Sequence, residues 1–196
     1  MRVGVLALQG DVQEHSAILE SLGAEAIALR QVGDLESIDA IVIPGGESTT
    51  ISLLLKHTGL ATPLQEWVNE GRPTLGTCAG LVLLASSVSD GRPDQLYLNG
   101  LDVTVQRNGF GRQQSSFEAT VHAPTLGGPI EAVFIRAPRI TAVGPSVEVL
   151  GVLPSAQGGE PEPVLVGQGS LIACSFHPEL AHEVRVHARL LEMVGR

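Results

Sequence analysis

Short apolar runs alternate with amphipathic stretches through the first half of the chain. The apolar runs have the length and composition of strands buried in a sheet, and they lie at Arg2–Leu8, Ala26–Leu29, Ala40–Ile43 and Thr74–Thr77. Stretches of helical character follow them, at Val12–Leu22, Ser48–Leu55, Pro63–Asn69 and Ala79–Ala85. This strand–helix alternation predicts a parallel sheet with helices on both faces.

The first predicted helix carries start and stop signals. Asp11 can cap its start, Glu14 stands three residues on in the capping-box position, and Gly23 ends the helix. The pattern therefore predicts a helix whose first turn Asp11 and Glu14 cap together.

The second half consists mainly of short β-like runs separated by turn residues. These runs lie at Leu101–Gln106, Phe117–His122, Ala132–Ile135, Val147–Leu153 and Val164–Val166. Hairpins and antiparallel additions to the sheet are expected there. Leu171–Ser175 predicts a further apolar strand, His182–Val194 a closing amphipathic helix, and the polar stretch Gln157–Pro163 a loop at a hairpin tip.

Composition narrows the class of protein. A length of 196 residues, with 43% hydrophobic and 17% charged residues, predicts one compact globular domain over residues 1–196. The net charge is −9 and no basic run occurs, so nucleic acid and anionic membranes are not expected partners. Two cysteines make no disulfide framework, and no stretch approaches the roughly 20 apolar residues of a membrane helix, so a cytoplasmic location is expected.

The strongest local signal is Gly76-Thr77-Cys78-Ala79-Gly80, between a predicted strand and a predicted helix. It is the cysteine version of a nucleophile elbow, in which the flanking glycines relieve crowding and the helix N-terminus favours a thiolate. The N–H of Ala79 would then face an oxyanion. The alternative is a small buried cysteine beside glycines that allow tight helix–strand packing. Cys174 lies in the middle of a predicted strand, and we expect it to belong to the core.

Two further motifs follow predicted strands. In His177-Pro178-Glu179, Pro178 favours an extended His177, so that the imidazole and the carboxylate lie side by side and Glu179 orients the ring. In Pro44-Gly45-Gly46-Glu47-Ser48, the glycines let the backbone approach a ligand, and Gly46 is a candidate second oxyanion donor. Taken alone, the first motif could be a surface His-Pro turn and the second an ordinary tight loop.

Together, these three motifs in this order resemble the triad class of glutamine amidotransferases. Finer similarities point to the glutaminase subunit of pyridoxal 5'-phosphate synthase: Leu8-Gln9-Gly10 with Glu14-His15, Gly45–Thr50, Gly76–Gly80, Arg107–Gln113, Ser116-Phe117-Glu118, Phe134–Pro138 and Ser175–Leu180. The Arg107–Gln113 and Phe134–Pro138 segments are the more specific ones. The resemblance extends over essentially the whole chain.

The resemblance implies a flavodoxin-like three-layer α/β fold, with a mostly parallel central sheet and added antiparallel strands. It implies a triad of Cys78, His177 and Glu179, no metal or organic cofactor, and glutamine contacts at Gly46, Glu47, Ser48, Arg107, Ile135 and Arg136. It also implies a (β/α)8-barrel synthase partner in a large ring assembly. Gln9, Glu14 and His15 are the docking residues expected from this resemblance.

These residues predict one reaction. The Cys78 thiolate attacks the side-chain amide of glutamine, Gly46 and Ala79 hold the oxyanion, and His177 protonates the departing ammonia before activating water. Ammonia is mostly protonated at neutral pH and is then not nucleophilic. A glutaminase used in synthesis should therefore deliver ammonia, shielded from solvent, to an acceptor site on another polypeptide. The alternatives are the subunit of a different amidotransferase, a cysteine-elbow hydrolase or stress protein of the same fold, and a non-catalytic binding module.

Overall fold

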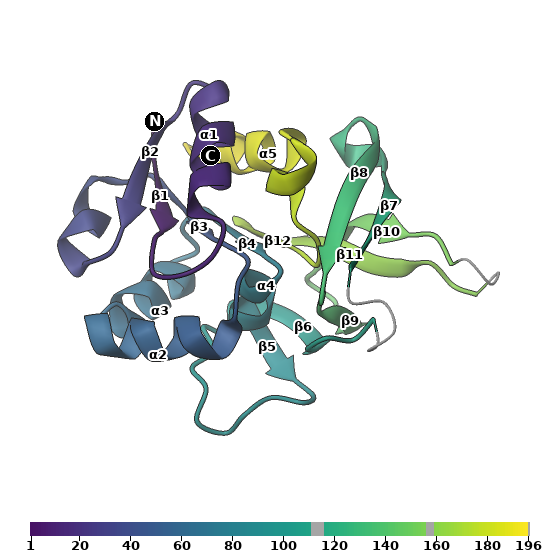
Figure 1. Ribbon diagram of the computed structural model, residues 1–196, viewed down its shortest axis with the longest axis horizontal. Helices are drawn as coiled ribbons and strands as arrows, with labels where there is room; N and C mark the ends of the chain where they lie inside the picture. The colour runs from purple at the N-terminus through teal and green to yellow at the C-terminus, as the bar shows by residue number, and fades with distance from the viewer. Residues whose placement is uncertain (111–115, 156–158, 196) are drawn as a thin grey trace.

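A computed structural model describes residues 1–110, 116–155 and 159–195. Its main feature is a nine-stranded sheet with the order β2-β1-β3-β4-β12-β11-β10-β7-β8 among these residues (Figure 1). Five neighbouring strands of this sheet are parallel: β1 (Arg2–Leu6), β2 (Glu25–Leu29), β3 (Ala40–Ile43), β4 (Thr74–Thr77) and β12 (Leu171–Cys174). The parallel half predicted from the apolar runs is therefore confirmed.

Antiparallel strands extend the sheet beyond β12. They are β7 (Ser116–Ala123), β8 (Gly128–Ile135), β10 (Glu148–Leu153) and β11 (Glu162–Gln168). The hairpin additions predicted for the second half are confirmed. The loop predicted at Gln157–Pro163 lies partly outside the described residues, and its predicted end is wrong because β11 already begins at Glu162.

A second, three-stranded sheet contains two strands that the sequence reading missed. It has the order β5-β6-β9, with β5 (Ala85–Val88), β6 (Leu101–Gln106) and β9 (Arg139–Val143). Only Ile140 is buried in β9, so the strand shows no clear apolar alternation. The helix predicted to continue to Ala85 ends at Leu84, and the chain passes directly into β5.

Helices cover both faces of the main sheet (Figure 1). The helices α1 (Val12–Ser21) and α5 (Arg185–Met193) pack on one face. On the other lie α2 (Ser48–Thr58), α3 (Ala61–Asn69) and α4 (Ala79–Leu84). Buried apolar residues form one cluster on each side of the sheet, which gives the three-layer α/β fold that was expected.

Some element boundaries differ from the prediction. The first strand ends at Leu6 rather than Leu8, and residues 7–10 turn toward the helix. The last helix begins at Arg185 rather than His182, because residues Pro178–Ala181 form a separate 3-10 turn, η3, and His182 has a left-handed backbone with φ 52°. Among the helices of the described ranges, none has both the length and the apolar character needed to cross a membrane.

The pairing of β4 with β12 positions the site. The two strands are parallel, with Thr77 opposite Cys174 in the register. Their carboxyl ends therefore lie at the same edge of the sheet, where sites of open α/β sheets form. Cys78 follows one strand directly, and His177 stands three residues beyond the other.

Candidate active site

Cys78 lies on a strained turn between β4 and α4. Its backbone has φ 48° and ψ −99°, a region that side chains rarely adopt. A Cβ atom on Gly76 would lie 2.8 Å from the carbonyl carbon of Gly80, and one on Gly80 would lie 2.2 Å from the Ile43 carbonyl oxygen. Both glycines are therefore needed sterically, as the elbow motif requires.

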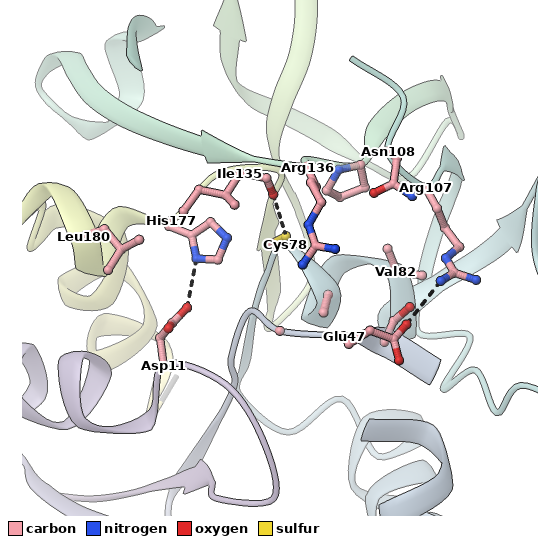
Figure 2. Close-up of a pocket in the computed structure, with 14 residues that line it drawn as sticks. Asp11, Glu47, Cys78, Val82, Arg107, Asn108, Ile135, Arg136, His177 and Leu180 are labelled. Atoms are coloured by element: carbon pink, nitrogen blue, oxygen red, sulfur yellow. Dashed lines mark hydrogen bonds and ion pairs between the residues drawn. The ribbon is translucent and has the colours of Figure 1, made fainter. Parts of the chain in front are cut away.

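Backbone carbonyl groups of two other strands, β12 and β8, contact Cys78. The Cys78 N–H donates to the Cys174 carbonyl across 2.9 Å, and the Cys78 thiol donates to the Ile135 carbonyl at 3.8 Å (Figure 2). Cys174 itself is completely buried, and burial first of all raises the pKa of its thiol well above the usual value. The expectation that Cys174 belongs to the core agrees with this position.

His177 and Glu179 form the expected pair, by a different backbone route. His177 Nδ1 lies 2.7 Å from Glu179 Oε1, and both side chains are buried. The predicted extended segment is wrong for Glu179, because Pro178 begins the 3-10 turn η3. The N–H of His177 donates to the Val133 carbonyl at 2.8 Å, which fixes the position of the residue ahead of that turn.

Asp11 approaches the same imidazole nitrogen, and the sequence reading missed this role. Its Oδ2 lies 3.2 Å from His177 Nδ1 (Figure 2). The predicted capping box with Glu14 is wrong, since the Asp11 side chain makes no capping hydrogen bond to α1. An aspartate before a helix looks like a cap in sequence, and only the fold shows that His177 is its partner.

The charges around His177 favour the imidazolium form. Burial works to lower the pKa of His177, but hydrogen bonds to Asp11, Cys78 and Glu179 outweigh it and raise the pKa to about 12. For Glu179 burial is the largest effect, and it raises the pKa of this carboxyl despite the neighbouring imidazole. An imidazolium at this place can act as a general acid toward a group bound at Cys78.

The Gly45-Gly46 loop follows β3 and lies against the imidazole. A Cβ atom on Gly45 would lie 2.3 Å from His177 Cε1, so only glycine fits there. Gly46 has φ 149°, in the region that favours glycine, and a Cβ atom on it would lie 2.4 Å from Gln9 Oε1. Gly46 and the first residue of α4, Ala79, thus both line the space beside Cys78.

A pocket of about 280 Å³ opens beside Cys78 (Figure 2). All the expected glutamine contacts line it, namely Gly46, Glu47, Ser48, Arg107, Ile135 and Arg136. Asn108 and Arg136 both have positive φ values, 48° and 44°, so the backbone turns sharply at this wall. Residues 111–113 of the specific Arg107–Gln113 segment lie outside the described residues.

An ion pair crosses the far end of the pocket. Arg107 Nη2 lies 3.3 Å from Glu47 Oε1, and the Glu47 carboxylate also accepts from the N–H groups of Thr49 and Thr50 at the start of α2. Burial raises the pKa of Glu47, but these hydrogen bonds outweigh it and lower the pKa to about 2. Gln95, which the sequence reading missed, accepts from Arg107 at 3.5 Å. This end of the pocket therefore offers a cation, Arg107, and an anion, Glu47, to a ligand.

The expected docking residues have different environments. Glu14 is exposed on α1, and Gln9 is half-buried with its Oε1 accepting from the Glu47 N–H at 2.7 Å. His15 is completely buried and lies 2.8 Å from His187 of α5. A direct contact between His15 and a partner protein does not fit this position, because the His15 side chain is buried in the core.

One set of described residues could in principle hold a metal ion. Asp11, His177 and Glu179 offer one ligand atom each, and these atoms lie within 4.8 Å of one another. However, His177 Nδ1 faces both carboxylates at hydrogen-bond distance, and a proton on that nitrogen can bridge them to the imidazole. The geometry is that of a charge-assisted hydrogen-bond network.

Comparison with known proteins identifies the family. The model of the SNO glutamine amidotransferase family matches residues 5–196. The chain belongs to this family. Among curated SNO-type relatives, the pyridoxal 5'-phosphate synthase subunit PdxT of Acidothermus cellulolyticus is 50% identical over 99% of this chain and 94% of that protein. The protein of the same name from Mycobacteroides abscessus is 51% identical over 98% of this chain and 96% of its own length.

Solved structures agree with this membership. A crystal structure of a glutamine amidotransferase is 45% identical to this SNO family member, with a TM-score of 0.89 over 99% of both chains. The PurLQS structure from Thermotoga maritima has a TM-score of 0.71 over 97% of both chains at only 14% identity, which shows a shared fold alone. The chain thus has the flavodoxin-like fold of the SNO family's structural neighbours.

Proposed function

We propose that this chain is the glutaminase subunit of a pyridoxal 5'-phosphate synthase, acting as a single domain. It hydrolyses glutamine to glutamate and ammonia and passes the ammonia to a synthase subunit. The observation that carries the proposal is the position of Cys78 on its strained elbow beside the buried His177–Glu179 pair. The names of the relatives, which are pyridoxal 5'-phosphate synthase subunits, support the choice of partner.

Glutamine carries a carboxylate and an ammonium group at the end opposite its amide. The Arg107–Glu47 pair offers a complementary charge to each of them, and Arg136 adds a second cation on the pocket wall. Binding there places the side-chain amide toward Cys78. Ser48 and Ile135 also line the pocket.

The reaction begins with a cysteine thiolate and an imidazolium. Cys78 Sγ bonds to the amide carbon, and the carbonyl oxygen gains negative charge. The N–H groups of Gly46 and Ala79 stabilise that oxyanion. When the C–N bond breaks, His177 gives its proton to the nitrogen, ammonia leaves and a thioester remains on Cys78.

Water then completes the cycle. Neutral His177 takes a proton from water, which attacks the thioester carbon, and glutamate leaves as the thiolate forms again. Glu179 holds His177 Nδ1 throughout, so that the other ring nitrogen faces the reacting atoms. No metal or organic cofactor takes part in this sequence.

The ammonia acceptor lies on another polypeptide. We propose a (β/α)8-barrel synthase subunit, arranged in a large ring, with Gln9 and Glu14 near the start of α1 at the docking face. His15 contributes to this docking face only indirectly, because its buried side chain packs beneath α1. Because Gln9 contacts the Glu47 N–H, docking near Gln9 can bias the peptide of Gly46 that stabilises the oxyanion.

Glutamate production should be measured for the chain with and without the synthase subunit. Cys78→Ala should lose a factor of roughly 10⁴–10⁶ in turnover, whereas the matched Cys174→Ala should keep most activity. Full activity in Cys78→Ala would exclude the mechanism. Full activity of the wild-type chain alone would remove the activation by docking and leave the chemistry intact.

A second measurement tests the division of labour between the subunits. In the complex, Cys78→Ala should stop the formation of pyridoxal 5'-phosphate from glutamine, and ammonium salt at raised pH should restore it. Failure of ammonium to rescue an intact mutant complex would assign Cys78 a role beyond ammonia supply. Activation by a different synthase would overturn the partner assignment and leave the glutaminase standing.

A further inference from the structure

A chain of buried polar side chains continues behind the catalytic pair. Glu179 Oε1 faces His177, while Glu179 Oε2 is buried and has no hydrogen bond of good geometry among the described residues. His15 Nε2 lies 3.5 Å from this oxygen. His15 also contacts Thr77 Oγ1 through Nε2 at 3.2 Å and His187 Nε2 through Nδ1 at 2.8 Å.

Four parts of the fold meet in this chain of contacts. His15 belongs to α1, Thr77 to β4, Glu179 to η3 and His187 to α5. His15, Thr77 and His187 are completely buried, and Glu179 is nearly so. Buried polar groups at such distances are kept only when they satisfy one another, because an unpaired one costs about 1–3 kcal/mol. The cluster is also separate from the glutamine pocket, whose lining includes none of these four residues.

Both histidines of the cluster are neutral. Burial lowers the pKa of His15 well below its usual value and that of His187 to about 4. A neutral imidazole has one N–H donor and one acceptor nitrogen, so the 2.8 Å contact contains a single proton. The position of that proton decides what His15 Nε2 presents to Glu179.

Only one arrangement suits an ionised Glu179. If His187 Nε2–H donates to His15 Nδ1, the proton of His15 lies on Nε2 and points toward Glu179 Oε2 and Thr77 Oγ1. In the opposite arrangement, a lone pair of His15 Nε2 faces the carboxylate. The Glu183 carbonyl raises the pKa of His187, and His187 Nδ1 makes no hydrogen bond of good geometry within the described ranges, so the need of the ionised Glu179 carboxylate for a donor decides between the two arrangements.

We infer that His15 is a positioning residue for the glutaminase: its Nε2–H holds the second oxygen of Glu179, and His187 selects the His15 tautomer that does so. The inference rests on the proposed function. A carboxylate held at one oxygen turns easily about its last torsion, which is broad. Asp11 is a second acceptor for the same imidazole nitrogen. The contact from His15 keeps Glu179 Oε1 hydrogen-bonded to His177 Nδ1, although Asp11 competes for the same nitrogen.

Removing the His15 donor has a predictable effect on pH dependence. The titratable groups around Glu179 are Asp11, Glu14, His15, Cys78, Cys174, His177 and His182. Of these, His15 is the group facing Oε2. Loss of a donor to the carboxylate disfavours its ionised form and raises its pKa further. Protonated Glu179 has no negative charge to stabilise the His177 imidazolium, so the acid limb of kcat/KM should move to higher pH.

Two amide substitutions separate positioning from packing. The side-chain nitrogen of glutamine reaches the place of imidazole Nε2, whereas that of asparagine reaches only the place of Nδ1. His15→Gln should therefore retain kcat within a few-fold, and His15→Asn should lose about 10–100-fold in kcat with little change in KM. His57→Gln, on an exposed position of α2, is the matched surface control and should match the wild type.

Glutamate production is measured with the wild-type synthase subunit present, across pH, together with urea unfolding of each variant. Equal kcat and equal acid limbs for folded His15→Asn and His15→Gln would overturn the inference while the glutaminase stands. No glutamine hydrolysis by the wild type would overturn the proposed function itself, and this inference with it.

A direct measurement covers the case in which His15→Asn folds poorly. In the ¹⁵N-labelled wild-type chain, long-range ¹⁵N–¹H spectra should show the His15 proton on Nε2 and a bare Nδ1. A proton on His15 Nδ1 at neutral pH would overturn the inference, because Nε2 could then not donate to Glu179.

Discussion

Gly45→Ala should inactivate the enzyme without unfolding it. The new Cβ atom would lie 2.3 Å from His177 Cε1 and 2.8 Å from Nδ1. Gly45 does not have the left-handed backbone that would strain alanine, so the effect is steric and acts on the imidazole. To reach an ordinary contact of 3.4 Å, Cε1 must retreat by roughly 1 Å.

The loop cannot move away instead. The Gly45 carbonyl oxygen packs so closely against Gly10 that a Cβ atom there would lie 1.8 Å from it, and the next residue, Gly46, is held against Gln9. The ring must therefore shift, which breaks its alignment with Cys78. A misplacement of about 1 Å in a catalytic group costs on the order of 10²-fold in rate.

The assay compares kcat and KM for glutamine in the presence of the synthase subunit. Gly33→Ala is the matched control, because a Cβ atom at that exposed position meets no atom within 4 Å. Urea unfolding of both variants checks that they are folded, and the rate of Cys78 alkylation reports on the thiolate. A folded Gly45→Ala with kcat within twofold of Gly33→Ala would refute the reasoning.

Three further outcomes follow from the site. His177→Asn should cost roughly 10⁶-fold and Glu179→Gln roughly 10⁴-fold in kcat, because only the imidazole transfers the proton; equal losses in steady-state assays would contradict these roles. Arg107→Gln should raise KM about 10–100-fold with kcat nearly unchanged, since it removes a charged contact to the glutamine carboxylate; an unchanged KM would place the carboxylate elsewhere. The pKa of His187 is lowered to about 4, so the unfolded chain binds the proton more tightly. Stability should therefore fall from pH 6.5 toward pH 4, by about 3 kcal/mol for this group, and urea unfolding of His187→Leu should show a flatter pH dependence.

The sequence predicted those features that rest on strong local patterns. The parallel strands are continuous apolar runs, and the elbow around Cys78 needs glycines at fixed spacing, so both were visible in the chain. The strands β5 and β9 were missed because each buries few side chains and neither shows a clear alternation.

Contacts between polar residues that lie far apart in the chain could not be predicted from the sequence. Asp11 was read as a helix cap, because an acidic residue before an amphipathic stretch normally has that role, and its contact with His177 depends on how α1 packs beside η3. His15 lies at an apolar position of α1, and its partner His187 is far along the chain. The spacing of residues along the chain therefore could not indicate that the side chains of His15 and His187 are in contact.

The neighbouring positions of β4 and β12 affect when the enzyme becomes active during its own synthesis. Cys78 leaves the ribosome before β12 and before His177 and Glu179, which follow that strand. Until β12 inserts between β4 and β11, the elbow lacks both its hydrogen bond to Cys174 and the proposed proton donor, His177. A nascent or prematurely terminated chain therefore contains the cysteine without the means to use it, and glutamine is not consumed by incomplete protein.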